Sequence, residues 1–220
     1  MAHVLKHYNP PQDPFLDILY QDTDIIAVNK PSGLLSVPGK LPEHQDCVET
    51  RARTLFPESA MIHRLDMETS GVILLAQTLH ALRHVSMQFE KRKTKKKYIA
   101  QVFGLLKDDE GTIDQPLICD WPNRPLQMID HERGKKAITH YKVLSKHATY
   151  TRVALTPITG RSHQLRVHMQ YLGHPILGDP LYAKDAALAA ASRLHLHAET
   201  LTITHPSTGE TLTFTVPADF

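Results

Sequence analysis

The stretch Met61-Ile-His-Arg-Leu-Asp-Met-Glu-Thr-Ser-Gly-Val-Ile-Leu-Leu-Ala76 places two charged side chains just before a short apolar run. Arg64 and Asp66 stand in its polar part, and every residue from 72 to 76 is apolar. A polar turn followed by such a run predicts a loop that leads into a buried strand. Arg64 and Asp66 would then be held at the edge of a core, where charged groups on a rigid scaffold are candidates for chemistry.

Strand and helix patterns also follow one another on both sides of this stretch. Asp46 and Glu49 form a predicted capping box for one helix. A later helix is predicted to begin at its cap Ser162 and to end at Gly173. Because the order shows no regular βαβ alternation, it predicts an α+β fold with a mostly antiparallel sheet. The clearest patterns are strands at 16–20, 25–29, 194–204 and 211–216, and helices at 48–56 and 79–89.

Length and composition are those of an ordinary globular protein. The 220 residues can form one domain with a sizeable core or two small ones. No apolar run is long enough for a transmembrane helix, and residues 1–14 contain no signal-peptide core, so no membrane partner is expected. Cys47 and Cys119 are too few for a disulfide framework or a zinc site, which favours a reducing cytoplasm.

The net charge of +2 does not by itself indicate a nucleic-acid partner, but one strongly basic segment does indicate such a partner. Six of the seven residues from Lys91 to Lys97 are cations, and an apolar strand pattern follows them. Such a cluster is typical of phosphate contacts, and Lys93, Lys95 and Lys96 are the candidates. The alternative is a solvated helix end, because cations are also favoured at helix C-termini.

The stretch around Asp66 resembles the H-R-L-D-x-x-T-S-G signature of the RluA-type pseudouridine synthases. Further blocks resemble the same family in the same order: 28–39, 97–100, 157–168, 173–179 and 196–198. Segments 118–125 and 217–220 look closest to its short dual-specificity branch. The resemblance implies the pseudouridine synthase fold, with a central mixed, mostly antiparallel sheet, flanking helices and a catalytic cleft. We expect residues 1–220 to form a single catalytic domain without a separate N-terminal RNA-binding module.

The resemblance also implies roles for individual residues. Asp66 is expected to be the catalytic carboxylate, acting either as a nucleophile at C1′ or as a base at C2′ of the uridine. Arg166 is expected to pair with Asp66 and keep it ionised. Tyr98 would offer an aromatic face and a hydroxyl to the flipped uracil, although a tyrosine at the start of an apolar strand is by itself more often a core residue.

Other residues are expected to contact RNA. The target uridine must leave its stack, and Arg64 has the long planar cation that could fill the vacated space. Its alternative is a structural ion pair with Asp66 or Glu68. His63 and Arg161, which stand in matched motifs, are further candidates, together with the three lysines of the basic segment.

Isomerisation of uridine needs no redox step or energy source, and the sequence contains no nucleotide-binding loop and no HExxH motif. We therefore expect no cofactor and no metal. The expected substrates are 23S ribosomal RNA and the anticodon stem-loop of transfer RNA, and the expected state is a cytoplasmic monomer. The alternatives are a family member acting on one RNA class, a metal-dependent hydrolase built on the histidines, a glycosidase using Asp66 and Glu68, and a non-catalytic RNA-binding module.

Overall fold

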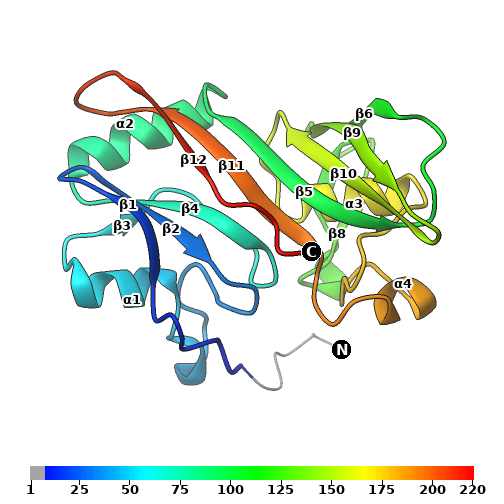
Figure 1. Ribbon diagram of the computed structural model, residues 1–220, viewed down its shortest axis with the longest axis horizontal. Helices are drawn as coiled ribbons and strands as arrows, with labels where there is room; N and C mark the ends of the chain where they lie inside the picture. Colours follow the sequence, from blue (N-terminus) through cyan, green and yellow to red (C-terminus); the bar gives the residue numbers. More distant parts are fainter. Residues whose placement is uncertain (1–7) are drawn as a thin grey trace. The chain divides into compact units, whose positions relative to one another are not determined.

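The computed structural model describes residues 8–220 (Figure 1). Contacts within the chain group these residues into two compact units. Unit 1 contains residues Lys97–Leu196 and Phe220, and unit 2 contains residues 8–96 and His197–Asp219. In the described part of the chain, no helix has the length and apolar character needed to span a bilayer.

Unit 2 is built around the strand that follows Asp66. This strand, β4, pairs antiparallel with β2 and β3 and parallel with the start of β11, while β1 extends the sheet from β2 and β12 pairs with β11. The elements are β1 (Asp17–Gln21), β2 (Ile25–Lys30), η1 (Pro42–His44), α1 (Val48–Leu55), β3 (Ala60–Met61), β4 (Ser70–Ala76), α2 (Leu79–Glu90), β11 (Leu196–Thr204) and β12 (Thr211–Thr215).

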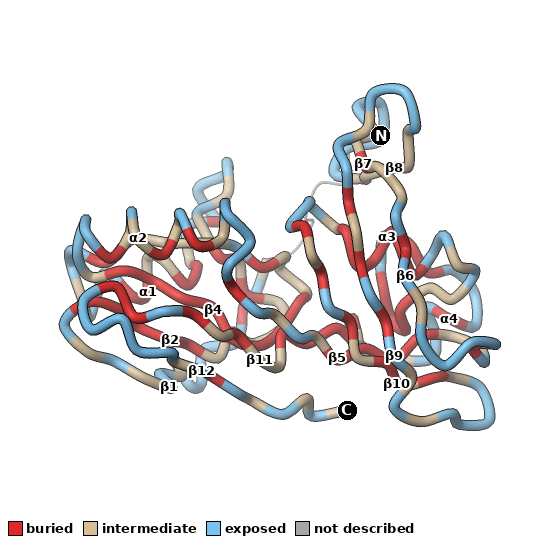
Figure 2. The backbone as a smooth tube through the Cα atoms, turned by 90° about the horizontal axis from the view of Figure 1, so that it is seen from above, coloured by how far each residue is buried: buried red, intermediate tan, exposed pale blue. Residues whose placement is uncertain are grey.

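Strand β4 is buried at every position (Figure 2). Val72 and Leu74 pack with Ala81 and Val85 of α2, which covers this part of the sheet. Gly71 has φ +112°, and a Cβ there would lie 2.3 Å from the carbonyl oxygen of Ala198. Only glycine therefore allows β11 to approach the start of β4 this closely.

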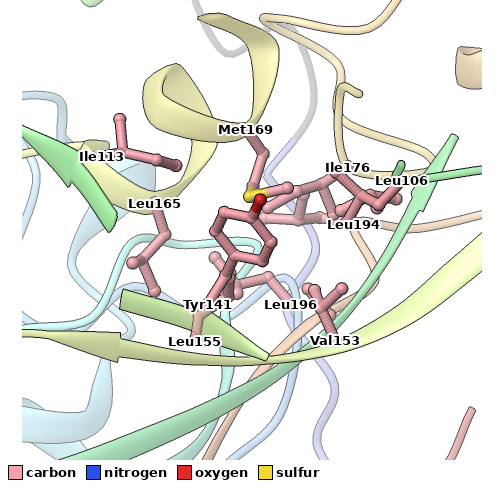
Figure 3. Packing of buried hydrophobic residues seen from close by; sticks show 12 residues of the cluster. Leu106, Ile113, Tyr141, Val153, Leu155, Leu165, Met169, Ile176, Leu194 and Leu196 are labelled. Atoms are coloured by element: carbon pink, nitrogen blue, oxygen red, sulfur yellow. The ribbon is translucent and has the colours of Figure 1, made fainter. Parts of the chain in front are cut away.

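Unit 1 carries four antiparallel strands in the order β5-β10-β9-β6, and a separate two-stranded hairpin, β7–β8. Figure 3 shows its core, in which Leu165 and Met169 of α3 lie over Val153 and Leu155 of β10. The elements are β5 (Lys95–Phe103), β6 (Glu110–Asp114), β7 (Leu117–Cys119), η2 (Trp121–Asn123), β8 (Gln127–Ile129), β9 (Ile138–Lys146), β10 (Tyr150–Pro157), α3 (Gln164–Tyr171) and α4 (Asp185–Ala189).

The predicted α+β class and the mostly antiparallel strand order are confirmed. The predicted helices at 48–56 and 79–89 correspond to α1 and α2, and the predicted C-terminal strand pair corresponds to β11 and β12. The expectation of a single domain over residues 1–220 stays a prediction.

Two predicted helix caps are wrong. Cys47, and not Asp46, caps α1: its Sγ accepts from the Thr50 amide, and the Thr50 hydroxyl accepts from the Cys47 amide. Asp46 instead accepts two hydrogen bonds, of 2.6 and 2.7 Å, from the buried guanidinium of Arg51.

Helix α3 begins after His163, which adopts the left-handed region at φ 54° and makes no capping hydrogen bond with its side chain. Ser162 is therefore not its cap. Gly173 follows the helix with φ +83°, as expected of a residue that closes a helix.

Candidate active site

Asp66 lies in the turn between β3 and β4, where the amide of Thr69 donates to the Asp66 carbonyl at 3.1 Å. Its side chain is half-buried, and Arg64, two residues earlier, is exposed. The predicted loop leading into a buried strand is thus confirmed. The chain on the C-terminal side of Asp66 is fixed in the core of unit 2.

Ser36 holds the residue immediately before Asp66. Its hydroxyl donates to the carbonyl of Leu65 at 2.7 Å and accepts from the Leu65 amide at 3.1 Å. Ser36 is buried, with 3% of its surface exposed, so both bonds are shielded from water. The main chain at Leu65 is therefore fixed independently of the Asp66 side chain.

Lys30 holds the residue immediately after Asp66. The ammonium donates to the carbonyl oxygens of Met67 (2.7 Å), Leu34 (2.6 Å) and Pro31 (2.9 Å), and the residue is completely buried. Three acceptors match the three N–H groups of a protonated lysine. Burial lowers the pKa of Lys30 to about 7, while the nearby charges of Asp66 and Glu68 raise it.

Two further bonds complete the attachment of this loop. The amide of Gly33 donates to the Met67 carbonyl at 3.0 Å, and the hydroxyl of Ser32 donates to the Glu68 carbonyl at 2.8 Å. The segment from Lys30 to Ser36 therefore binds the main chain on both sides of Asp66. Such fixed geometry is what a catalytic carboxylate needs, because a small displacement of a reacting group lowers the rate strongly.

Replacing Lys30 with Met is expected to remove a pH dependence from the stability of the fold. Because the folded-state pKa is lowered from 10.5 to about 7, the unfolded chain binds the proton more tightly between these values. Relative to the variant, the free energy of unfolding of the unaltered protein should rise with pH by up to about 1.4 kcal/mol per unit in this window. The same stability is lost as the pH falls towards the folded-state pKa.

Urea unfolding of both proteins between about pH 7 and pH 9.5 measures this difference. Parallel pH curves for the two proteins would contradict it, because Lys30 would then keep its ordinary pKa in the fold.

The His63 ring makes two structural contacts, one hydrogen bond and one stacking contact. Its Nε2 accepts from the amide of Leu74 at 3.1 Å, and the ring stacks on Phe89 with centroids 4.5 Å apart. Burial, and then the charge of Lys96, lower the pKa of His63 to about 3. The imidazole is therefore neutral near pH 7 and anchors the Asp66 loop to β4; its contact with RNA stays a prediction.

The three candidate lysines of the basic segment differ in exposure. Lys93 follows α2 in a turn in which Arg92 has φ 56°, and Lys95 is the first residue of β5; both lysines are exposed. Lys96 is half-buried beside His63, and burial together with the charge of Arg92 lowers its pKa. Lys93 and Lys95 are therefore better placed for phosphate than Lys96.

Replacing Lys93 and Lys95 with Ala is expected to weaken RNA binding and to flatten its salt dependence. Each lost phosphate contact should reduce the slope of log affinity against log salt by about 0.7 to 0.9. The single Lys96→Ala variant should change the slope less. Affinities measured over a range of salt concentrations test this, and an unchanged slope in the double variant would show that these lysines form only a solvated face.

Arg166 lies on α3 in unit 1 and is almost completely buried. Its Nε and Nη2 donate to the two carboxylate oxygens of Asp179 at 2.8 and 2.6 Å, and its guanidinium lies 5.1 Å from the ring centroid of Tyr182. This pairing uses two of the five guanidinium N–H groups and fixes the plane of the others. Sequence reasoning missed Asp179 as a partner, although the segment 173–179 belongs to a matched block.

Tyr98 and Arg161 are the other predicted site residues of unit 1. Tyr98 lies on β5 opposite Leu155 and is half-buried against the core. Arg161 is exposed before α3, and its Nε donates to the carbonyl of Lys136 at 3.1 Å. Asp66 belongs to unit 2, and Arg166, Tyr98 and Arg161 belong to unit 1. The Asp66–Arg166 pair stays a prediction.

The histidines considered as metal ligands have other contacts. His168 bonds to the Thr139 hydroxyl and the Gln115 carbonyl, and His197 bonds to the Ser70 hydroxyl and the Val216 carbonyl. Within residues 8–220, no group of three or more His, Cys, Asp or Glu side chains is arranged to hold a metal ion.

Known proteins resemble this chain over almost its whole length. The protein named dual-specificity RNA pseudouridine synthase RluA is 58% identical in Salmonella typhi and in Escherichia coli K12, in each case over 98% of this chain and 99% of the relative. The Haemophilus influenzae protein of that name is 52% identical over 99% of this chain and 100% of the relative.

Solved structures show the same architecture. Human RNA pseudouridylate synthase domain containing 1 superposes with a TM-score of 0.79 at 28% identity, over 95% of this chain and 86% of that one. Human RNA pseudouridylate synthase domain containing 4 superposes with a TM-score of 0.73 at 29% identity, over 92% of this chain and 88% of that one. The fold expected from the sequence is thus confirmed. Residues 24–171 match the family described as RNA pseudouridylate synthase, and the chain belongs to this family of pseudouridine-forming isomerases.

Proposed function

We propose that this protein converts selected uridines to pseudouridine in both 23S ribosomal RNA and transfer RNA, in the cytoplasm, with Asp66 as the catalytic carboxylate. The observation that carries the proposal is the 58% identity, over almost the full length of both chains, to relatives named for dual specificity. A protein restricted to one RNA class and a metal-dependent hydrolase are both less well supported by that identity.

The geometry of unit 2 supports the role of Asp66. The reaction breaks the bond between C1′ and N1, turns the uracil and rejoins it through C5. Asp66 would attack C1′ or remove a proton from C2′, and either step needs an ionised carboxylate in a fixed position. The bonds of Ser36 to Leu65 and of Lys30 to Met67 hold the main chain on both sides of it.

Arg166 is proposed to stabilise the ionised form of Asp66. A guanidinium beside a carboxylate lowers the pKa of the carboxyl group, and Asp179 holds the plane of Arg166 before any substrate arrives. Tyr98 is proposed to contact the flipped uracil with its aromatic ring. His63, with its pKa lowered to about 3, would act there as a neutral group and not as an acid.

The dual specificity is tested with two purified RNAs carrying tritium at uridine C5, one a 23S ribosomal RNA fragment and one a transfer RNA anticodon stem-loop. Joining the uracil through C5 releases that tritium. Release from both RNAs is expected. Release from only one would restrict the protein to that class, and free uracil in place of pseudouridine would point to a hydrolytic reaction.

A further inference from the structure

An exposed aromatic plane with a cation stacked on it lies at the tip of the β7–β8 hairpin. Trp121 is the only tryptophan of the chain, and 66% of its surface is exposed. The guanidinium carbon of Arg124 lies 4.4 Å from the centroid of its ring. The cation covers only part of the indole, so a large aromatic surface remains open to solvent.

The tip is held in one conformation by its own hydrogen bonds. The amide of Asp120 donates to the carbonyl of Leu126 at 2.9 Å, and the amide of Asn123 donates to the carbonyl of Asp120 at 3.0 Å. The side chain of Asn123 also donates to the Asp120 carboxylate at 3.0 Å. Trp121 is therefore exposed on a fixed turn, which lowers the entropic cost of binding a partner there.

The base of the hairpin is attached to the surroundings of Arg166. Leu117 of β7 packs with Val167 of α3 and with Tyr182. The Tyr182 hydroxyl accepts from the amide of Gln127 in β8 at 2.9 Å, and the same tyrosine ring lies beneath the guanidinium of Arg166. Figure 2 shows the hairpin projecting from α3 with mostly exposed and intermediate residues.

Three exposed cations lie near this base, next to the ion pair of Asp130 and Arg133. The main chain of Lys135 pairs with Leu117 of β7 through bonds of 3.0 and 2.8 Å, so its exposed side chain starts beside the hairpin. Lys136 is exposed next to it, and its carbonyl accepts from the exposed Arg161. The hairpin thus combines an aromatic plane at its tip with cations near its base, and single-stranded nucleic acid is bound by such features, through base stacking and phosphate contacts.

We propose that Trp121 and Arg124 form a stacking platform for an unpaired base of the substrate RNA, with Lys135, Lys136 and Arg161 binding the adjacent phosphates. The inference rests on the proposed function, since it takes the substrate RNA as its ligand. Stacking on an aromatic face tolerates any base. Such a platform therefore suits an enzyme that accepts loops from two different classes of RNA.

Fluorescence of the single tryptophan tests the platform directly. The Asp66→Asn chain is titrated with an unlabelled stem-loop RNA, so that binding occurs without turnover, and parallel titration of labelled RNA follows binding by anisotropy. We expect the tryptophan emission to be quenched with the same Kd as the anisotropy change. An anisotropy change without any change in emission would overturn the proposal, because RNA would then bind without contacting Trp121.

Substitutions provide the second test. Trp121→Ala and Trp121→Leu are expected to raise the Kd for RNA about 5- to 150-fold, the range for loss of one stacked base. Trp121→Phe keeps an aromatic plane and should raise it less than about threefold. The matched control is Leu144→Ala, which removes another exposed apolar side chain of unit 1, on β9, and should leave the Kd unchanged.

The single-turnover rate at saturating RNA separates this proposal from the proposed function. It should be unchanged in Leu144→Ala, and in the Trp121 variants half of the maximal rate should be reached only at a higher RNA concentration, because the platform holds RNA. Equal Kd values for the Ala and Phe variants, with circular dichroism showing that both are folded, would overturn the stacking role. Absence of tritium release in the unaltered protein would instead contradict the proposed function.

Discussion

Replacing Asp66 with Asn is expected to abolish pseudouridine formation, with a fall of more than about a thousandfold in the single-turnover rate. An amide can neither form the bond to C1′ nor accept the proton from C2′. The loop should keep its shape, because Ser36, Lys30 and Gly33 bind the main chain at Leu65 and Met67 and not the carboxylate. RNA affinity should therefore change little.

The matched control is Glu68→Gln, which neutralises a second half-buried carboxylate in the same loop. Its rate should remain within about tenfold of the unaltered protein. Equal losses in the two variants would contradict a special role for Asp66 and would favour a carboxylate pair. Release of free uracil is the product test for that alternative.

Replacing Arg64 with Lys is expected to lower the single-turnover rate on a structured stem-loop by about 10- to 100-fold, although the charge is kept. Arg64 is exposed beside Asp66, and no salt bridge joins it to Asp66 or Glu68 within residues 8–220. Its planar guanidinium can stack in the gap left by a flipped base and contact phosphate with a forked pair of bonds, and an ammonium cannot.

An RNA whose target uridine is already unpaired and unstacked distinguishes base flipping from an electrostatic role. On this RNA the Arg64→Lys variant should lose less than about threefold, because less flipping work remains. Equal losses on both RNAs would indicate that Arg64 acts on Asp66 electrostatically. An unchanged rate on both would exclude it from the reaction.

Local sequence patterns predicted the secondary structure around Asp66 and in α2, because short-range interactions determine these elements. The polar residues around Asp66 and the apolar run from Val72 to Ala76 were enough to predict a turn before a buried strand, and β4 contains this whole run. The periodic apolar positions of α2 predicted a helix for the same reason, but of these positions Val85 is buried and Leu79 is exposed.

Contacts between distant residues could not be predicted in this way. Lys30 binds the carbonyl of Met67 across 37 positions, and no periodicity indicates that a lysine ends a strand inside the core. Asp179 binds Arg166 from a loop 13 positions away, and only a structure shows that it fixes the guanidinium. The cap of α1 was wrong because Asp46 has a stronger partner in Arg51.

Mapping of pseudouridines in ribosomal and transfer RNA tests the central claim most directly. Cells lacking this protein are compared with the same cells carrying either the unaltered gene or the Asp66→Asn variant at equal protein levels. We predict that defined pseudouridines disappear from both 23S ribosomal RNA and transfer RNA, return with the unaltered protein, and stay absent with the variant. An unchanged pseudouridine map in cells without the protein, or full restoration by the variant, would contradict the account.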